Sequence, residues 1–154
     1  MRRVLHMGVG DASYATLRAW TDDACRRLCG GRLSEGGRTA IVLAVHETVR
    51  NVLEHAGPES SGSIEVVVEA DGDLLRLSVA HEGCPFDRAT APAPVFDGTA
   101  ERGFGLFLTE AALDRVEYGR SDDGRACVRM EKCLGFAGEG ESPAATAAEE
   151  RKGR

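Results

Sequence analysis

Two polar side chains with complementary chemistry, Glu47 and Asn51, lie four residues apart in the stretch LAVHETVRNVLEHAG. Residues at this spacing share one face of a helix, so the carboxylate and the amide would lie side by side. Oxygen ligands of these kinds suit Mg²⁺, which takes few ligands from protein and the rest from phosphates and water. The Glu47 carboxylate can also accept the proton of an attacking hydroxyl. Alone, Glu-x-x-x-Asn is a weak motif, because a solvated pair at a helix edge has the same spacing.

Two glycine-containing segments follow. The first, EGCPFD, comes directly after a predicted strand, and the second, ERGFGLFL, opens a predicted helix. Glycine lets the backbone approach a ligand closely, and a helix N-terminus offers free N–H groups to a phosphate. Gly103 and Gly105, with Arg102 beside them, are therefore candidate phosphate-binding residues. Glycines needed only for tight turns would give the same local pattern.

Hydrophobic periodicity and turn residues predict the elements that must position these groups. Their expected ranges are a strand at 3–8, helices at 12–29 and 33–57, strands at 64–70 and 74–81, a helix at 103–116, and two strands within 116–134. The second helix carries an apolar stripe beside a polar row; the stripe is Ile41, Val45, Val49 and Val52, with Thr48 among them, and the row is Glu47, Asn51 and His55. This grouping predicts a two-layer α+β sandwich, with helices on one face of a mixed, mostly antiparallel sheet.

Composition is that of one globular domain: 154 residues, 42% hydrophobic, with a net charge of -6. We expect the folded domain to span 1–134 and the polar, low-complexity tail 135–154 to be disordered. The acidic balance and the lack of a basic stripe with interleaved aromatics argue against direct nucleic-acid binding. No apolar run is long enough for a signal peptide or a membrane span, so we expect a cytoplasmic protein.

The five cysteines contain no C-x-x-C pair and no cluster tight enough to suggest zinc. We therefore expect them to be small apolar side chains of a protein in a reducing compartment. Cys84 lies beside the suspected site, where it is either a space-filling side chain or a redox-sensitive thiol.

The order of these segments resembles the GHKL ATPase superfamily, whose members share the Bergerat ATP-binding fold. Within it, the chain looks most like the small bacterial anti-sigma factor serine kinases. LAVHETVRNVLEHAG resembles their N box, RGFGLFLTEAALDRVEYG their second glycine box, and VRMEK the closing strand, with Lys132 at the usual basic position. The likeness covers about 3–134.

This resemblance implies an ATP- and Mg²⁺-dependent serine kinase that regulates transcription. Its partners would be a sigma factor and a STAS-domain anti-anti-sigma protein, whose serine receives the phosphate. Glu47 would be the base and, with Asn51, would hold Mg²⁺. The other nucleotide-binding positions would be His81, Gly83, Arg102, Gly103 and Gly105. Relatives dimerise, often through the sheet side near the first strand.

Three positions depart from the family pattern. His81 replaces an aspartate that accepts a hydrogen bond from the adenine amino group, and Pro85 replaces a glycine of the lid. Arg125 and Ala126 follow Gly124 where a threonine often helps to fix adenine. Losing a charge-assisted hydrogen bond costs about 1.5–3 kcal/mol. Two interpretations stay open: a site that binds ATP weakly or with changed base preference, and a non-catalytic protein-binding regulator with a degenerate nucleotide site.

Overall fold

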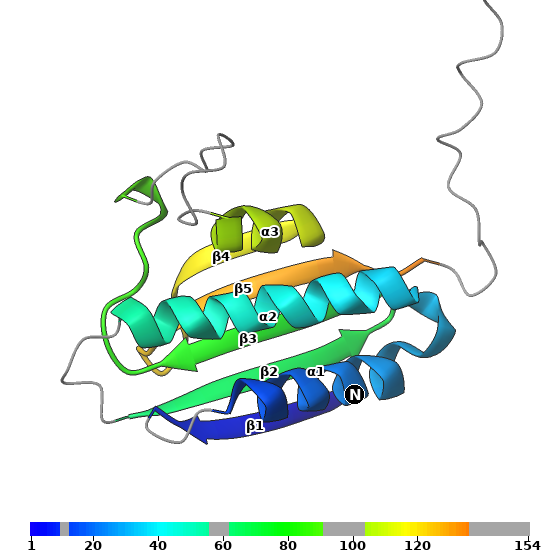
Figure 1. The fold of residues 1–154 in the computed structure, drawn as a ribbon, viewed down its shortest axis with the longest axis horizontal. Coiled ribbons are helices and arrows are strands. Elements are labelled where there is room, and N and C mark those ends of the chain that lie inside the picture. Colours follow the sequence, from blue (N-terminus) through cyan, green and yellow to red (C-terminus); the bar gives the residue numbers. More distant parts are fainter. Residues whose placement is uncertain (10–12, 56–61, 91–103, 136–154) are drawn as a thin grey trace, which may run out of the picture.

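A five-stranded sheet with helices packed on one of its faces forms the fold (Figure 1). The computed structural model describes residues 1–9, 13–55, 62–90 and 104–135. The elements in chain order are β1 (Arg2–Gly8), α1 (Tyr14–Cys29), η1 (Gly30–Arg32), α2 (Glu35–His55), β2 (Ser63–Asp71), β3 (Leu74–His81), η2 (Arg88–Thr90), α3 (Phe104–Ala112), β4 (Arg115–Arg120) and β5 (Ala126–Cys133). The predicted two-layer sandwich is confirmed.

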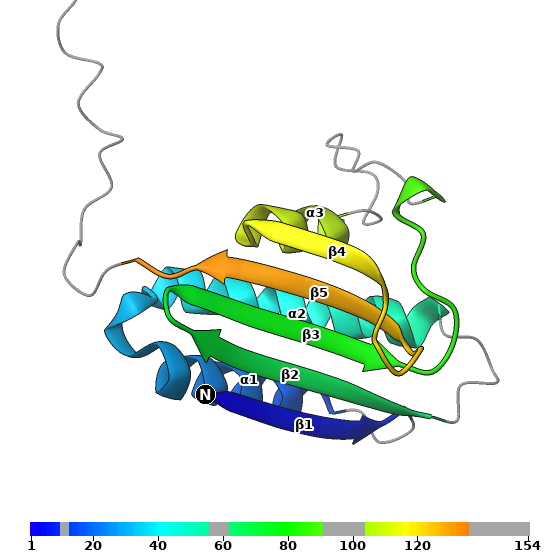
Figure 2. The same cartoon turned by 180° about the vertical axis from the view of Figure 1, so that it is seen from behind.

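The strand order is β1-β2-β3-β5-β4, and every neighbouring pair among the described strands is antiparallel. The sheet is therefore antiparallel throughout its described part, where a mixed, mostly antiparallel sheet was predicted. Figure 2 shows the sheet face that none of the described helices covers. There, long charged side chains pair across strands, as Arg125 Nη2 does with Glu65 Oε1 at 3.1 Å. Such charged side chains keep this face polar toward water, although Val67 and Cys127 are buried and are not part of the core cluster.

Side-chain caps fix where the first two long helices begin. Ser13 Oγ accepts the N–H of Thr16 at 3.3 Å, and Ser34 Oγ accepts the N–H of Gly37 at 3.0 Å. Each satisfies one of the free N–H groups of a first helical turn. Gly30, with φ of 56°, ends α1 in a backbone conformation that other residues rarely adopt. These residues therefore fix where α1 begins and ends and where α2 begins.

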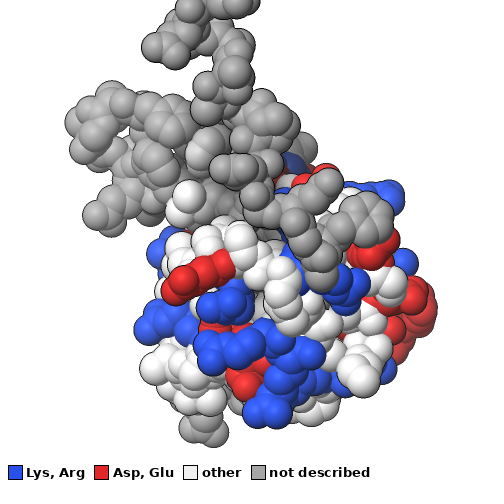
Figure 3. Space-filling model, turned by 90° about the vertical axis from the view of Figure 1, so that its right-hand side faces the viewer, with Lys and Arg blue, Asp and Glu red and all other residues white. Residues whose placement is uncertain are grey.

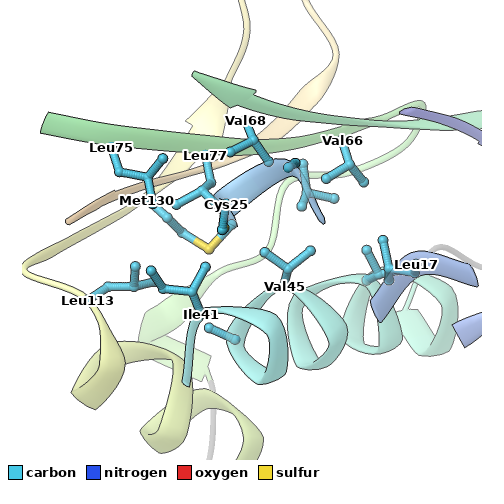
Figure 4. Packing of buried hydrophobic residues seen from close by; sticks show 14 of the residues in the cluster. Leu17, Cys25, Ile41, Val45, Val66, Val68, Leu75, Leu77, Leu113 and Met130 are labelled. Carbon is cyan, nitrogen blue, oxygen red and sulfur yellow. The ribbon is translucent and has the colours of Figure 1, made fainter. Parts of the chain in front are cut away.

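The hydrophobic core lies between the sheet and the helices. Alternate residues of the central strands face it, including Val66, Val68, Leu75 and Leu77, while Ile41 and Val45 fill it from α2 (Figure 4). The predicted stripe of α2 is buried throughout: its apolar members and Thr48 are all at most 7% exposed. Burial of this stripe leaves the neighbouring Glu47–Asn51 row at the edge of the core.

The third helix is shorter than predicted. It ends at Ala112, and Arg115 and Val116 already belong to β4. Asp114 explains the early end, because its Oδ2 accepts the N–H of Cys133 at 2.6 Å and its Oδ1 lies 3.0 Å from Lys132 Nζ. The hydrogen bond from Cys133 is the main cause that lowers the pKa of Asp114. Lys132, matched to a basic position of the family, thus pairs within the fold.

Arginines gather at the end of the molecule where α1 ends, with acidic side chains among them (Figure 3). We call this the arginine face; its members are Arg3, Arg26, Arg27 and Arg38, with Asp22 and Asp23. Each aspartate is shared by two arginines, one of them on α1 and the other on β1 or α2. The surface therefore ties α1 to its neighbours, although exposed ion pairs contribute little stability individually.

The cysteines divide into two groups. Cys25, Cys29 and Cys127 are buried, as predicted, whereas Cys84 and Cys133 are exposed. The space-filling interpretation of Cys84 is therefore wrong: its loop leaves the thiol at the surface. Burial raises the pKa of Cys25 to about 12, so that thiol stays protonated and a poor nucleophile.

Native-state alkylation checks this division. We expect iodoacetamide at pH 8 to modify Cys84 and Cys133 and to leave the three buried thiols unmodified until the protein is unfolded in guanidinium. Mass spectrometry of peptides from native and unfolded samples measures both. Equal modification of Cys25 in the two samples would contradict the described core.

Candidate functional site

The candidate site begins on α2, where Glu47 and Asn51 share one face as predicted. The Glu47 side chain is 13% exposed and Asn51 is half-buried, while His55 is exposed at the last residue of the helix. A carboxylate this strongly buried is unusual for a merely solvated helix edge. The open alternative of a solvated Glu–Asn pair is therefore disfavoured for Glu47.

The start of α3 lies directly against that carboxylate. A Cβ atom placed on Gly105 would overlap Oε2 of Glu47 and would lie 3.2 Å from its Cδ. A larger residue at this position would require the end of the Glu47 side chain to move, so glycine allows the close approach seen here. The residue predicted to bind phosphate and the residue predicted to be the base are thus brought together, although they are far apart in the sequence.

Packing behind this contact holds α3 in place. Thr109 is 2% exposed, and its Oγ1 donates to the carbonyl of Gly105 at 2.8 Å and lies 3.5 Å from the carbonyl of Ala44 on α2. Thr48 Oγ1 donates to the same Ala44 carbonyl at 2.8 Å. These buried contacts fix the two helices relative to each other near Glu47.

Two charged or titratable neighbours of Glu47 were missed by sequence reasoning. Arg50 Nη2 lies 2.9 Å from Glu47 Oε2, and His46 Nδ1 lies 3.9 Å from Oε1. The i,i+3 spacing of Glu47 and Arg50 was a signal that could have revealed the first pair. The position of His46 depends on Tyr14 of α1, whose ring packs edge-on at 4.7 Å between centroids, and no local pattern indicates that.

Burial is the main cause that lowers the pKa of His46; Glu47 opposes this shift, and Arg18 and Arg50 add to it. In the unfolded chain a histidine gains its proton near pH 6.5, and the folded His46 gains it only at lower pH. The unfolded state therefore binds more protons as the pH falls below about 6.5, so the free energy of unfolding decreases there.

His46→Gln should weaken this pH dependence. The free energy of unfolding of the wild type should fall between pH 7.5 and 5.5 more than that of the variant, by at most about 1.4 kcal/mol per pH unit for one proton. Urea unfolding at the two pH values measures it. If the free energy of unfolding of His46→Gln depended on pH as strongly as that of the wild type, the lowered pKa of His46 would be contradicted.

The end of β3 carries His81, which is 6% exposed. Its Nδ1 lies 2.9 Å from the carbonyl of Glu82. A carbonyl only accepts hydrogen bonds, so Nδ1 must carry the proton, and in the neutral ring Nε2 is then an acceptor. In the next strand Ala126 is the direct cross-strand partner of His81. Two positions that depart from the family's adenine-binding pattern thus face each other in one register pair.

Residues 82–90 leave β3 and are tied down at several points. Gly83 has φ of 130°, a conformation that favours glycine. The ring of Phe86 packs against that of Tyr118, with 5.2 Å between the ring centroids. Arg88 Nε lies 2.7 Å from Glu110 Oε1 on α3. These contacts hold Phe86 against β4 and Arg88 against α3. Most of the lid expected at 88–102 lies outside the described residues. Arg102 and Gly103 lie outside the described residues.

Within the described part of the chain, no group of three or more His, Cys, Asp or Glu side chains is arranged to hold a metal ion. None of the described helices is long and apolar enough to cross a membrane.

Comparison with known proteins decides the family. The family model described as "Histidine kinase-like ATPase domain" matches residues 11–132, most of the chain. The chain belongs to this family. As a histidine kinase-like ATPase domain, it has Glu47, His81 and Gly105 inside the matched range, together with the elements from α1 to β4 and all of β5 except its last residue.

Among curated proteins, this ATPase-like domain is similar to the serine-protein kinase RsbW of Staphylococcus aureus strains JH9 and Newman. It is 31% identical to each over 84 residues, which is 48% of this chain and 53% of the relative. The chain thus spans about half the length of the curated relatives it matches.

Among solved structures, this ATPase-like domain is similar to two structures of the catalytic domain of histidine kinase ThkA, both free of nucleotide. The TM-scores are 0.50 and 0.52, with 15% and 13% sequence identity. Each match covers 86% of this chain, and 98% and 97% of the respective structures. At this identity the likeness shows a shared fold.

Proposed function

We propose that the protein is an ATP-binding regulator of the anti-sigma kinase type, which phosphorylates a serine of a STAS-domain partner in the cytoplasm and binds a sigma factor. One observation carries the proposal: the buried Glu47 carboxylate lies against Gly105 at the start of α3. Membership of the ATPase-like family and similarity to a serine-protein kinase support it.

The residues present fit a Mg²⁺-nucleotide. Glu47 Oε2 is buried, and Arg50 Nη2 forms an ion pair with it at 2.9 Å, but no described donor makes a well-directed hydrogen bond to it. A carboxylate oxygen can accept more than one hydrogen bond, so a hydroxyl or a water that donates to it would be favoured. Mg²⁺ needs few protein ligands because nucleotide phosphates and water supply the others, and one carboxylate with one amide suffices.

Each residue then has a distinct role. Glu47 would accept the proton of the attacking serine hydroxyl, and Asn51 would help to hold Mg²⁺. Gly105, with Arg102 and Gly103, would bring backbone N–H groups to the phosphates. ATP, with Mg²⁺, supplies the phosphoryl group and its electrostatic activation when bound.

His81 is compatible with adenine in place of an aspartate. With its Nδ1 proton donated to Glu82, the neutral ring offers an acceptor at Nε2, and the adenine amino group is a donor. Guanine has a carbonyl at that position, which would face the same acceptor unfavourably. We therefore propose that adenine is preferred, with lower affinity than a charged carboxylate would give.

A second candidate function is a non-catalytic regulator that binds a protein partner and has a degenerate nucleotide site. The pairing of His81 with Ala126 favours it, because both positions where the family fixes adenine through polar side chains differ here. β1 lies at the sheet edge and its Val4 is 39% exposed, which supports the further proposal of a homodimer through this edge.

Calorimetric titration with ATP, ADP and GTP, with and without Mg²⁺, tests these alternatives. The proposal expects saturable, Mg²⁺-dependent binding of ATP that is tighter than that of GTP, and tighter ATP binding after His81→Asp. Absence of ATP binding at millimolar concentration in both proteins would reject the kinase and leave the non-catalytic regulator.

A further inference from the structure

Arg50 occupies an unexpected place in the candidate site. Its Nη2 lies 2.9 Å from Glu47 Oε2, and its Nε lies 3.4 Å from Glu54 Oε1, so the guanidinium is held between two carboxylates of its own helix. The Arg50 side chain is 40% exposed, so solvent and solutes can reach it. The Arg50 side chain is therefore accessible from solvent, while its Nη2 atom contacts the buried Glu47 carboxylate.

The guanidinium also lies beside the first turn of α3. The position that a Cβ atom would take on Gly105 is 3.5 Å from Arg50 Nη2. Arg50 thus lies within contact distance of the glycine that the proposed function assigns to phosphate binding. Its charge and the N–H groups of the helix start would act on the same anion.

The hydrogen bonds of this group are incomplete. Arg50 Nε is buried and, like Glu47 Oε2, has no hydrogen-bond partner among the described residues, although opposite charges lie near both atoms. A guanidinium presents five N–H donors in a planar fork that matches the oxygens of a phosphate. The ion pairs with Glu47 and Glu54 leave part of this capacity unused.

We propose that Arg50 binds the phosphate chain of the nucleotide beyond the α-phosphate and so makes the site selective for di- and triphosphates over monophosphates. This inference rests on the proposed function, because it places phosphate at the start of α3. In the absence of nucleotide, Glu47 and Glu54 hold the guanidinium close to where the phosphates would bind, so little side-chain entropy remains to be lost on binding.

Affinities for ATP, AMP and inorganic tripolyphosphate, measured by calorimetry with Mg²⁺ in the full chain, test this. Arg50→Gln should weaken binding of ATP and of tripolyphosphate by about 10- to 100-fold and change AMP affinity by less than about twofold. Arg50→Lys should lie between, because it keeps the charge and loses the fork. Arg26→Gln, which breaks a comparable helical ion pair with Asp22, should leave all three affinities unchanged.

The outcomes separate the two proposals. An equal loss for ATP and AMP in Arg50→Gln would show a structural role and overturn the inference, as would unchanged ATP and tripolyphosphate affinity. If ATP does not bind the wild type but tripolyphosphate does, and Arg50→Gln weakens it, the ATP-dependent function fails and the inference stands. Binding of neither to the wild type overturns both.

Discussion

Glu47→Gln is expected to lower phosphate transfer to a serine substrate by about 10²- to 10⁴-fold, the usual contribution of a positioned base. Glutamine has the same shape, so it can occupy the space beside Gly105 without moving α3. ATP affinity should therefore change only a few-fold, and the loss should appear in kcat. Transfer of labelled γ-phosphate, with affinity measured separately by calorimetry, gives the two quantities.

Glu54→Gln is the matched control, because Glu54 also lies on α2 and also pairs with Arg50, at 3.4 Å, but is more exposed. It should retain kcat within a few-fold. Equal loss of kcat in the two variants would show that general disturbance of the Arg50 ion pairs, and not the base, is responsible. If Glu47→Gln transferred phosphate as fast as the wild type, Glu47 would not be the catalytic base.

Gly105→Ala is expected to have the second large effect. The added Cβ would overlap Glu47 Oε2, so either the carboxylate must leave Arg50 or α3 must move away from α2. Overpacking of this kind typically costs about 1–3 kcal/mol of stability. Binding of ATP should be lost or strongly weakened, because the phosphate-binding turn and the acidic side chain are displaced together.

Gly36→Ala in the first turn of α2 is the control for this substitution. A Cβ atom at Gly36 would meet nothing within 4 Å, so alanine there should be neutral or stabilise the protein by up to about 1 kcal/mol. Urea unfolding and ATP titration of both variants measure the difference. Wild-type stability and affinity in Gly105→Ala would contradict the close packing of α3 on Glu47.

Much of the fold was predictable from local pattern. The alternation in IEVVVEA and the Gly72 turn indicated β2 and β3, and the helix expected at 33–57 corresponds to α2, which runs from Glu35 to His55. The end of α3 was placed too late, because the hydrogen bond from Cys133 to Asp114 joins residues distant in the sequence. Periodicity within one segment does not contain that information.

The candidate site was predictable in part. The helical spacing placed Glu47 and Asn51 on one face, but the burial of Glu47 against Gly105 depends on how two helices pack. The pairing of His81 with Ala126 depends on strand register, and the contact of His46 with Tyr14 on the position of α1. Roles for Arg102 and Gly103, which lie outside the described residues, stay predictions.

We propose that α2 and the start of α3 together bind a Mg²⁺-nucleotide. Amide NMR of the ¹⁵N-labelled protein, titrated with Mg²⁺ and a non-hydrolysable ATP analogue, tests it most directly. We expect the largest saturable shifts at the Gly105 backbone amide and the Asn51 side-chain amide, with smaller ones around His81. No shifts, or shifts confined to the arginine face at the far end of α1, would contradict it.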